Sequence, residues 1–119
     1  MTPIYASSAW SLDSVRQGAG FSRAHAPEAF YTRWGNPTTR DLETVLADLE
    51  RGSRALATGS GMGAIASAIL ACVESGDHVV AGSNLYTASM EIFTRLLPRY
   101  GIHTTFVDPR QPGAWLNAV

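Results

Sequence analysis

The residues best suited to chemistry lie in one glycine-rich segment, which reads Thr58-Gly59-Ser60-Gly61-Met62-Gly63-Ala64. We expect this segment to connect a short strand to a helix. Glycines at alternate positions let the backbone turn tightly and let a ligand come close to the amides. The free N–H groups at the start of a helix, with the helix dipole behind them, form an anion site that suits a phosphate. The segment is a candidate phosphate site, with a plain strand-to-helix turn as the alternative.

Two other glycine-rich ligand sites fit this segment less well. A dinucleotide-binding turn, approximated by Gly59-x-Gly61-x-x-Ala64, needs an acidic residue about 20 positions later, at the end of the next strand. The sequence there is Gly82-Ser83-Asn84, without an acidic residue. A Walker-type loop is excluded because it needs a lysine, and all 9 residues counted as Lys+Arg are arginine. The same composition excludes a Schiff base on a lysine of this sequence.

Tyr31 and Arg33 form a second candidate site. They are two residues apart in a segment expected to be extended, so both side chains should point the same way. Together they can present a hydroxyl and a bidentate guanidinium to one phosphate. An arginine next to a helix start is more commonly solvated, which is the alternative for Arg33.

Tyr86 is the third candidate, because it follows a strand expected at residues 78–81. In an open parallel sheet, ligands bind beyond the carboxyl ends of the strands. A tyrosine there can stack on a flat heteroaromatic ring and offer a phenol for acid–base chemistry. A buried structural tyrosine is the alternative.

The elements that position these residues follow from apolar periodicity and capping residues. Asn36 is a good N-cap and Pro37 a good first residue of a helix that should end near Gly52. The apolar face of this helix consists of Leu42, Val45, Leu46 and Leu49. Further helices are expected at 61–74 (buried on most faces), at 88–100 (ending at Gly101), and from 112 onward. Strands are expected at 55–58, 78–81 and 104–107.

Alternating helices and strands predict an α/β fold with a mainly parallel sheet and helical crossovers. The outer strands of such a sheet need further strands or other cover beside them. Three strands are therefore a small number for a sheet of this kind. Residues 1–35 show no sustained period but carry six aromatic residues: Tyr5, Trp10, Phe21, Phe30, Tyr31 and Trp34. Because aromatic rings favour burial, we expect an arm packed either on its own domain or on a second subunit.

Composition narrows the class of protein. The net charge of -1 argues against a nucleic-acid or anionic-membrane partner. The longest apolar stretch, 64–73, is too short to span a bilayer, and no signal peptide is visible. The single cysteine, Cys72, fits a reducing compartment and a core position, so we expect a cytoplasmic protein. No metal site is expected, because the histidines lack ligand spacing: His25, His78 and His103.

These segments together resemble the pyridoxal-5'-phosphate (PLP) enzymes of cysteine and methionine metabolism. That family includes cystathionine gamma-synthase, cystathionine gamma-lyase, methionine gamma-lyase and O-acetylhomoserine sulfhydrylase. The matching motifs run in order along nearly the whole chain: residues 3–8, Tyr31-Thr32-Arg33, Asn36-Pro37-Thr38, Ser60-Gly61-Met62, residues 75–80 and residues 97–102.

The resemblance implies a fold-type I PLP enzyme and a role for each candidate. Ser60, Gly61 and Met62 would bind the cofactor phosphate, the last two through backbone amides. Tyr86 would stack on the pyridine ring and take part in proton transfer. Tyr31 and Arg33 would reach across a dimer interface to the phosphate of the neighbouring subunit. Residues 1–35 would then be an extended arm at that interface and at the neighbouring active site, and residues 36–119 the first βα units of an incomplete PLP domain.

Two departures from the family pattern qualify this interpretation. Thr87 and Ala88 follow Tyr86 where the family usually has a glycine and a small residue, and methionine gamma-lyases carry a cysteine at the position of Ala88. The family's Schiff-base lysine also falls outside this sequence. The lysine is therefore expected from a complementary C-terminal polypeptide, or the sequence is a piece of a longer enzyme.

The expected activity is beta- or gamma-elimination or replacement on sulfur-containing or gamma-substituted amino acids. The expected assembly is an oligomer, homo- or hetero-, built of dimers that share active sites, with a tetramer as the favoured form. A non-catalytic assembly partner of such an enzyme is the alternative, and a dinucleotide-binding module is a weaker one.

Overall fold

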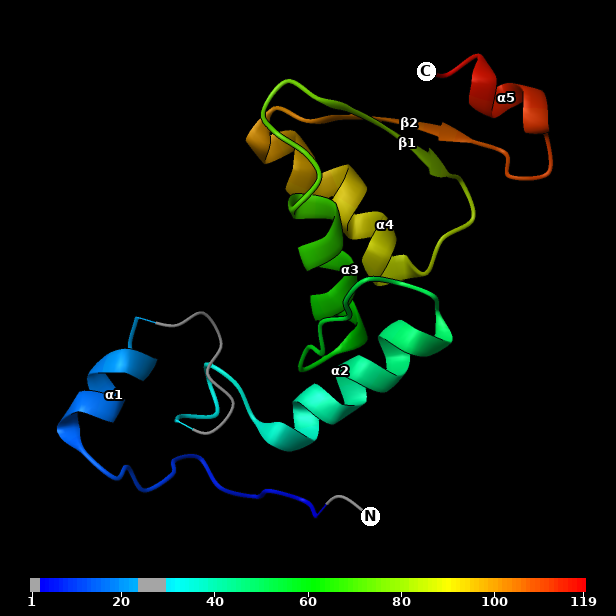
Figure 1. The fold of residues 1–119 in the computed structure, drawn as a ribbon. Helices are drawn as coiled ribbons and strands as arrows, with labels where there is room; N and C mark the ends of the chain where they lie inside the picture. The colour runs from blue at the N-terminus through cyan, green and yellow to red at the C-terminus, as the bar shows by residue number, and fades with distance from the viewer. Residues whose placement is uncertain (1–2, 24–29) are drawn as a thin grey trace. The chain divides into compact units, whose positions relative to one another are not determined.

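The computed structural model of the protein, drawn in Figure 1, describes residues 3–23 and 30–119. The chain forms two compact units, Met1–Ala57 and Thr58–Val119. Among the histidines, His25 lies outside the described residues. No helix in the described ranges is long and apolar enough to cross a membrane.

The N-terminal arm contains a helix that the sequence pattern did not indicate. Helix α1 spans Val15–Phe21, and the Oγ of its N-cap, Ser14, accepts a hydrogen bond from the amide of Gln17 at 3.1 Å. The expectation of an extended arm is therefore wrong for residues 15–21. A helix of 7 residues that includes Gly18 and Gly20 is too short to show an apolar period.

Helix α2, Pro37–Leu49, begins where the sequence predicts. The Oδ1 of Asn36 accepts a hydrogen bond from the amide of Thr38 at 2.9 Å, and Pro37 occupies the first turn. The helix ends at Leu49, and the chain then turns at Arg51, whose φ of 55° lies in the left-handed region. The predicted stop at Gly52 is therefore close, but a non-glycine residue makes the turn.

Residues 55–58, expected to be a strand, form none. A strand needs a partner ladder for its backbone groups, and in this unit the amide of Ala57 instead donates to Oε1 of Glu43 at 2.8 Å. Leu56 is 76% exposed, so the apolar character that predicted a buried strand is not used within this unit. The expected third strand is wrong for the described structure.

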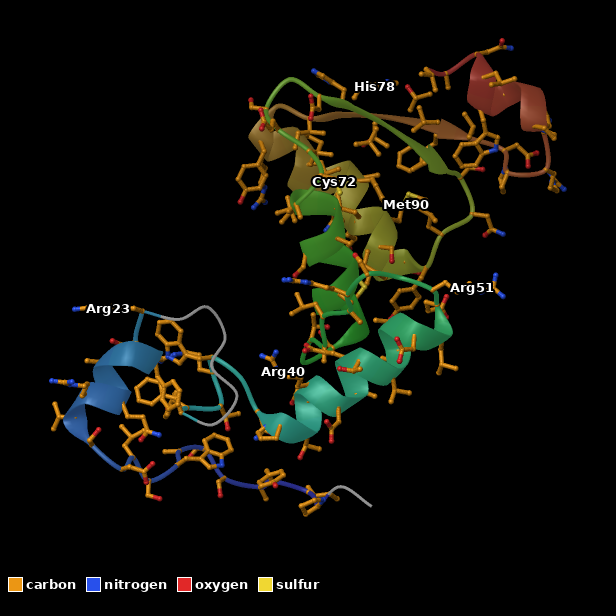
Figure 2. All side chains as sticks on the ribbon, viewed as in Figure 1. Arg23, Arg40, Arg51, Cys72, His78 and Met90 are labelled. Carbon is orange, nitrogen blue, oxygen red and sulfur yellow. The ribbon has the colours of Figure 1, made fainter. Side chains whose placement is uncertain are left out.

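The second unit begins with helix α3, Gly61–Leu70, which is shorter than the predicted 61–74. The expectation of burial on most faces is also wrong, because no residue of α3 is fully buried. One face, formed by Met62, Ala66 and Ile69, packs on the core, and Ile65 on another face is exposed. Cys72 follows the helix (Figure 2) and is exposed, which corrects its expected place in the core.

A two-stranded parallel sheet confirms the α/β class. Strands β1, His78–Gly82, and β2, His103–Val107, pair in register from His78↔His103 to Gly82↔Val107. Both strands match the predicted ones. Helix α5, Pro112–Leu116, follows β2 (Figure 1) where a further helix was expected to begin.

The helical crossover between these strands changes its winding along its length. It consists of helix α4, Thr87–Glu91, a π-helical segment η1, Ile92–Leu96, and a 3-10 turn η2, Leu97–Tyr100. One continuous helix was predicted, but Pro98 has no N–H to continue the α-helical ladder. Gly101 ends the element as predicted, with a left-handed φ of 71°.

The core of this unit is small. Its buried centre is Ile92, Leu97 and Ile102. Phe93 and Phe106 add an edge-on ring contact with centroids 6.3 Å apart, which joins η1 to β2. This core fixes the crossover and α3 against the sheet, so the starts of α3 and α4 are held in place.

Candidate cofactor site

Ser60 caps the start of α3, which is the candidate anion site. The Oγ of Ser60 accepts a hydrogen bond from the amide of Gly63 at 3.0 Å, and its carbonyl accepts one from the amide of Ala64 at 3.0 Å. The carbonyl also accepts from Oγ1 of Thr58 at 2.8 Å. Within residues 3–23 and 30–119, the amides of Gly61 and Met62 donate to no acceptor. Two N–H groups at the positive end of the helix are thus available to an anion.

The backbone of Gly61 is uncrowded at the point where a side chain would begin. A Cβ added at Gly61 would meet nothing within 4 Å. A Cβ added at Gly63 would lie 3.2 Å from Oγ of Ser60, which is tighter than ordinary contact. Gly61 therefore leaves room for a ligand, and Gly63 leaves room for the cap. We call Ser60, Gly61 and Met62 the phosphate cup.

Met62 anchors the cup to the core. Its side chain packs on the buried cluster, and Oγ of Ser89 donates to its Sδ at 3.8 Å. Ser89 is buried in the first turn of α4. This contact joins the first turn of α3 to the first turn of α4. The sequence analysis did not identify Ser89, and its one signal is a serine within an otherwise apolar helical face.

Tyr86 is the residue that immediately precedes α4, so the Ser89–Met62 contact brings it to the same region as the cup. Its carbonyl accepts a hydrogen bond from the amide of Met90 at 2.9 Å, which fixes its backbone. The side chain is 71% exposed and is not the buried structural tyrosine of the alternative reading. Its ring is available for stacking.

Tyr31 and Arg33 lie together in the first unit, but the backbone between them is not extended. Tyr31 pairs with Ala9 as an isolated antiparallel bridge, and its carbonyl then accepts a hydrogen bond from the amide of Trp34 at 2.8 Å. The expectation of an extended segment is wrong because this hydrogen bond closes a turn. The turn places the guanidinium carbon of Arg33 5.0 Å from the centre of the Tyr31 ring, within cation–π range.

Backbone dipoles, rather than titratable side chains, provide the charge at the cup. The clearest pKa shifts in the described part of the chain belong to Asp108 and Arg110, which follow β2. The side chain of Arg110 donates to the Asp108 carboxylate at 2.8 Å, which lowers the pKa of Asp108 and raises the pKa of Arg110.

Among the described residues, no group of three His, Cys, Asp or Glu side chains could hold a metal ion.

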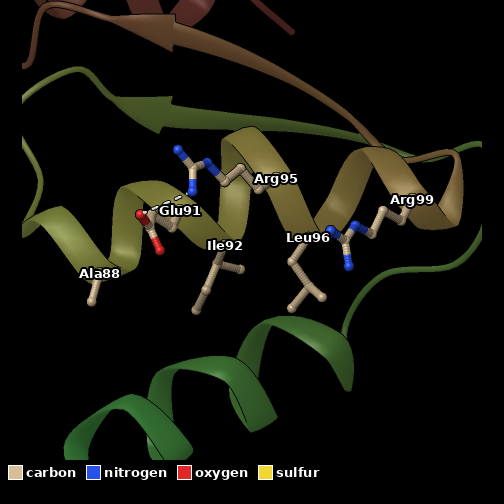
Figure 3. Close-up of a pocket in the computed structure, with 6 residues that line it drawn as sticks. All are labelled: Ala88, Glu91, Ile92, Arg95, Leu96 and Arg99. Carbon is tan, nitrogen blue, oxygen red and sulfur yellow. Dashed lines mark ion pairs between the residues drawn. The ribbon is translucent and has the colours of Figure 1, made fainter.

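A shallow hollow of about 260 Å³ lies on the crossover helix and is separate from the predicted site residues. Figure 3 shows Ala88, Ile92 and Leu96 pointing toward α3, and Arg95 paired with Glu91. That ion pair is 3.5 Å long and exposed. The hollow therefore contributes no residue to the cup.

Comparisons with known proteins identify the family of the chain. The chain matches the model of the Cys/Met metabolism PLP-dependent enzyme family over residues 1–119. It is 44% identical over 111 residues to an L-methionine gamma-lyase of Porphyromonas gingivalis, covering 93% of this chain and 28% of that protein. It is 37% identical over 118 residues to an O-acetyl-L-homoserine sulfhydrylase of Corynebacterium glutamicum, covering 98% of this chain and 27% of that protein.

A solved structure gives the same result for the fold and the cofactor. A Campylobacter jejuni protein described as an O-acetylhomoserine (thiol)-lyase superposes with a TM-score of 0.83 at 25% identity, covering 99% of this chain and 29% of that one. That structure contains N'-pyridoxyl-lysine-5'-monophosphate. The chain spans less than a third of the length of these relatives and corresponds to their N-terminal part. It belongs to the Cys/Met metabolism family of PLP-dependent enzymes.

Proposed function

We propose that this chain forms the N-terminal part of a PLP enzyme that performs beta- or gamma-elimination or replacement on sulfur-containing or gamma-substituted amino acids. The observation that carries the proposal is the phosphate cup, where Ser60 caps α3, the amides of Gly61 and Met62 are available, and Gly61 leaves open space at its Cα. The relatives include a lyase and a sulfhydrylase, so both elimination and replacement are included.

The residues present suit the cofactor. Gly61 and Met62 would donate their amides to its phosphate, and Ser60 would hold the helix start in shape. Tyr86 would stack on the ring and hold or move a proton at its phenol oxygen. When bound, PLP supplies an electron sink for bond cleavage next to the amino group.

Tyr31 and Arg33 would complete the phosphate site of a neighbouring subunit. The guanidinium lies over the Tyr31 ring, and its N–H groups would form a bidentate pair with the phosphate. Tyr5, Tyr31 and Trp34 in the arm are also partly exposed. This exposed aromatic surface supports an arm, residues 1–35, that packs on a second subunit of a dimer or of a tetramer built from dimers.

The covalent anchor of the cofactor would come from outside these 119 residues, because the sequence contains no lysine. We propose that a C-terminal region equivalent to the rest of the relatives, on a second polypeptide or in the same longer enzyme, carries that lysine, and that the complete site takes an amino acid substrate in the cytoplasm.

Ligand titration of the complex tests the proposal. The complex consists of this chain and a C-terminal polypeptide of the family that carries the cofactor-binding lysine. Trp10, Trp34 and Trp115 provide fluorescence. We expect PLP to change this fluorescence saturably and NAD to leave it unchanged. A saturable response to NAD, or no response to PLP in a folded complex, would reject the proposal.

A further inference from the structure

Asn36 does more than cap α2. Its Oδ1 accepts a hydrogen bond from the amide of Thr38 at 2.9 Å, which is the cap. Its Nδ2 donates to the carbonyl of Tyr5 at 3.0 Å and to Oγ1 of Thr32 at 3.3 Å. The residue is only 7% exposed. The amide orientation follows from chemistry, because Oδ1 faces a donor and Nδ2 faces a carbonyl, so both N–H groups of the side chain are used.

Thr32 continues this network to the arm. Its Oγ1 donates to the carbonyl of Ser7 at 2.6 Å, and its amide donates to the carbonyl of Ser8 at 2.9 Å. On the other side of the arm, the amide of Tyr5 donates to Oγ1 of Thr38 at 2.9 Å. Residues 5–8 are therefore held by the turn at residue 32 and by the first turn of α2. Asn36 touches both.

Thr32 lies between Tyr31 and Arg33 in the sequence. The hydrogen bonds that hold Thr32 in place therefore also hold the backbone that orients that pair. The cap could be made without the two donations from Nδ2, because a serine or an aspartate also caps a helix. Capping therefore does not explain why Nδ2 of Asn36 donates to Tyr5 and Thr32. They occur in a buried position, where an unmade hydrogen bond is costly.

We propose that Asn36 is a positioning residue, whose side-chain amide ties the arm to the turn and thereby holds Tyr31 and Arg33 in the orientation that meets a phosphate. This inference rests on the proposed function for the role of the phosphate. The anchoring itself rests only on the hydrogen bonds of the first unit.

The variant Asn36→Asp separates capping from anchoring. Aspartate caps a helix as well as asparagine does, but a carboxylate cannot donate, so both Nδ2 hydrogen bonds are lost. We expect amide hydrogen exchange at Tyr5 and Thr32 of the full chain to become about ten-fold faster, since a lost buried hydrogen bond has about that effect. Exchange within α2 should stay unchanged. In the complex with the C-terminal polypeptide, we expect the dissociation constant for PLP to rise by a similar factor.

A second pair of variants covers the case in which Asn36→Asp does not fold. Thr32→Val removes the hydroxyl that accepts from Asn36 and donates to Ser7, and Thr32→Ser keeps it. We expect the valine variant to show the same two effects and the serine variant to restore both. Thr44→Val is the control, because the hydroxyl of Thr44 donates, within the described part of the chain, to the carbonyl of Arg40 on the same helix.

Two results would overturn the inference. One is an Asn36→Asp variant with exchange and PLP affinity like those of the native chain, which would show that Asn36 only caps α2. The other is faster arm exchange with unchanged PLP affinity in a complex where Arg33→Ala does weaken PLP binding. If Arg33→Ala itself leaves PLP affinity unchanged, the proposed role of Arg33 fails, and the exchange of the arm amides alone decides whether Asn36 anchors the arm.

Discussion

The guanidinium of Arg33 lies over the ring of Tyr31, with 5.0 Å between its carbon and the ring centre. A guanidinium that lies over a ring face keeps N–H groups that can bind a phosphate in a bidentate manner. The ring thus pre-orients a charged side chain that would otherwise sample many rotamers, and the first prediction tests this arrangement.

Arg33→Ala should weaken PLP binding by the complex about ten- to one-hundred-fold, because a charge-assisted hydrogen-bond pair is lost. Titration of the complex with PLP measures this. Arg95→Ala is the matched control, since it removes the same charge from an exposed ion pair with Glu91 and should leave affinity unchanged. Full PLP affinity and full activity in Arg33→Ala would favour the alternative function, a chain that only scaffolds its partner.

Ser60→Ala should lower both stability and PLP affinity. Losing the hydrogen bond that its Oγ accepts from the amide of Gly63 removes the cap of α3, which costs about 1 kcal/mol of unfolding free energy. Ser14→Ala removes the equivalent cap of α1 and should leave PLP affinity unchanged. Chemical denaturation and PLP titration separate the two effects, and equal PLP affinity in both variants would count against the cup.

Alanine variants of Gly61 and Gly63 distinguish space that a ligand needs from space that the Ser60 cap needs. Gly61→Ala places a methyl group in open space, so unfolding free energy should be unchanged or higher by up to about 1 kcal/mol, while PLP affinity falls. Gly63→Ala places its methyl group against the Ser60 hydroxyl and should lower stability. Unaltered PLP affinity in a stable Gly61→Ala complex would mean that the open space at Gly61 is not the phosphate site.

Tyr86→Phe and Tyr86→Ala divide stacking from proton transfer. Phenylalanine keeps the ring, so the complex should bind PLP normally but turn over its amino acid substrate more slowly. Alanine loses the stacking, which is worth about 1 kcal/mol and therefore several-fold in affinity. Steady-state kinetics with PLP titration provides both numbers. Normal turnover by Tyr86→Phe would remove the phenol from the proposed chemistry.

Capping residues, glycines and short apolar runs predicted those elements whose starts and ends depend on neighbouring residues. Asn36 and Pro37 start α2 as their capping chemistry requires, α3 starts at the predicted Gly61, and Gly101 adopts the left-handed conformation that ends the crossover. The pairing of β1 with β2 also follows from two short apolar runs joined by a helical segment. Each of these features depends on residues close together in the sequence or on a regular alternation.

The features that the sequence did not predict depend on contacts with residues that are distant in the sequence. Residues 55–58 have the composition of a buried strand, but a strand forms only against a ladder, and the amide of Ala57 bonds to Glu43 instead. Apolar periodicity cannot say how much of α3 is covered by other elements. The turn that joins Tyr31 to Arg33 is closed by the amide of Trp34, and Thr32 holds it against the distant residues 7–8, which no local pattern links to it.

Covalent trapping of the cofactor tests the central claim most directly. The complex of this chain with the C-terminal polypeptide is incubated with PLP, reduced with borohydride, and each polypeptide is weighed by mass spectrometry. We predict a pyridoxyl group on a lysine of the C-terminal polypeptide, none on this chain, and strongly reduced labelling when Ser60→Ala and Arg33→Ala are combined. A folded complex whose labelling is unchanged by those two substitutions would contradict the claim that this chain supplies the phosphate site.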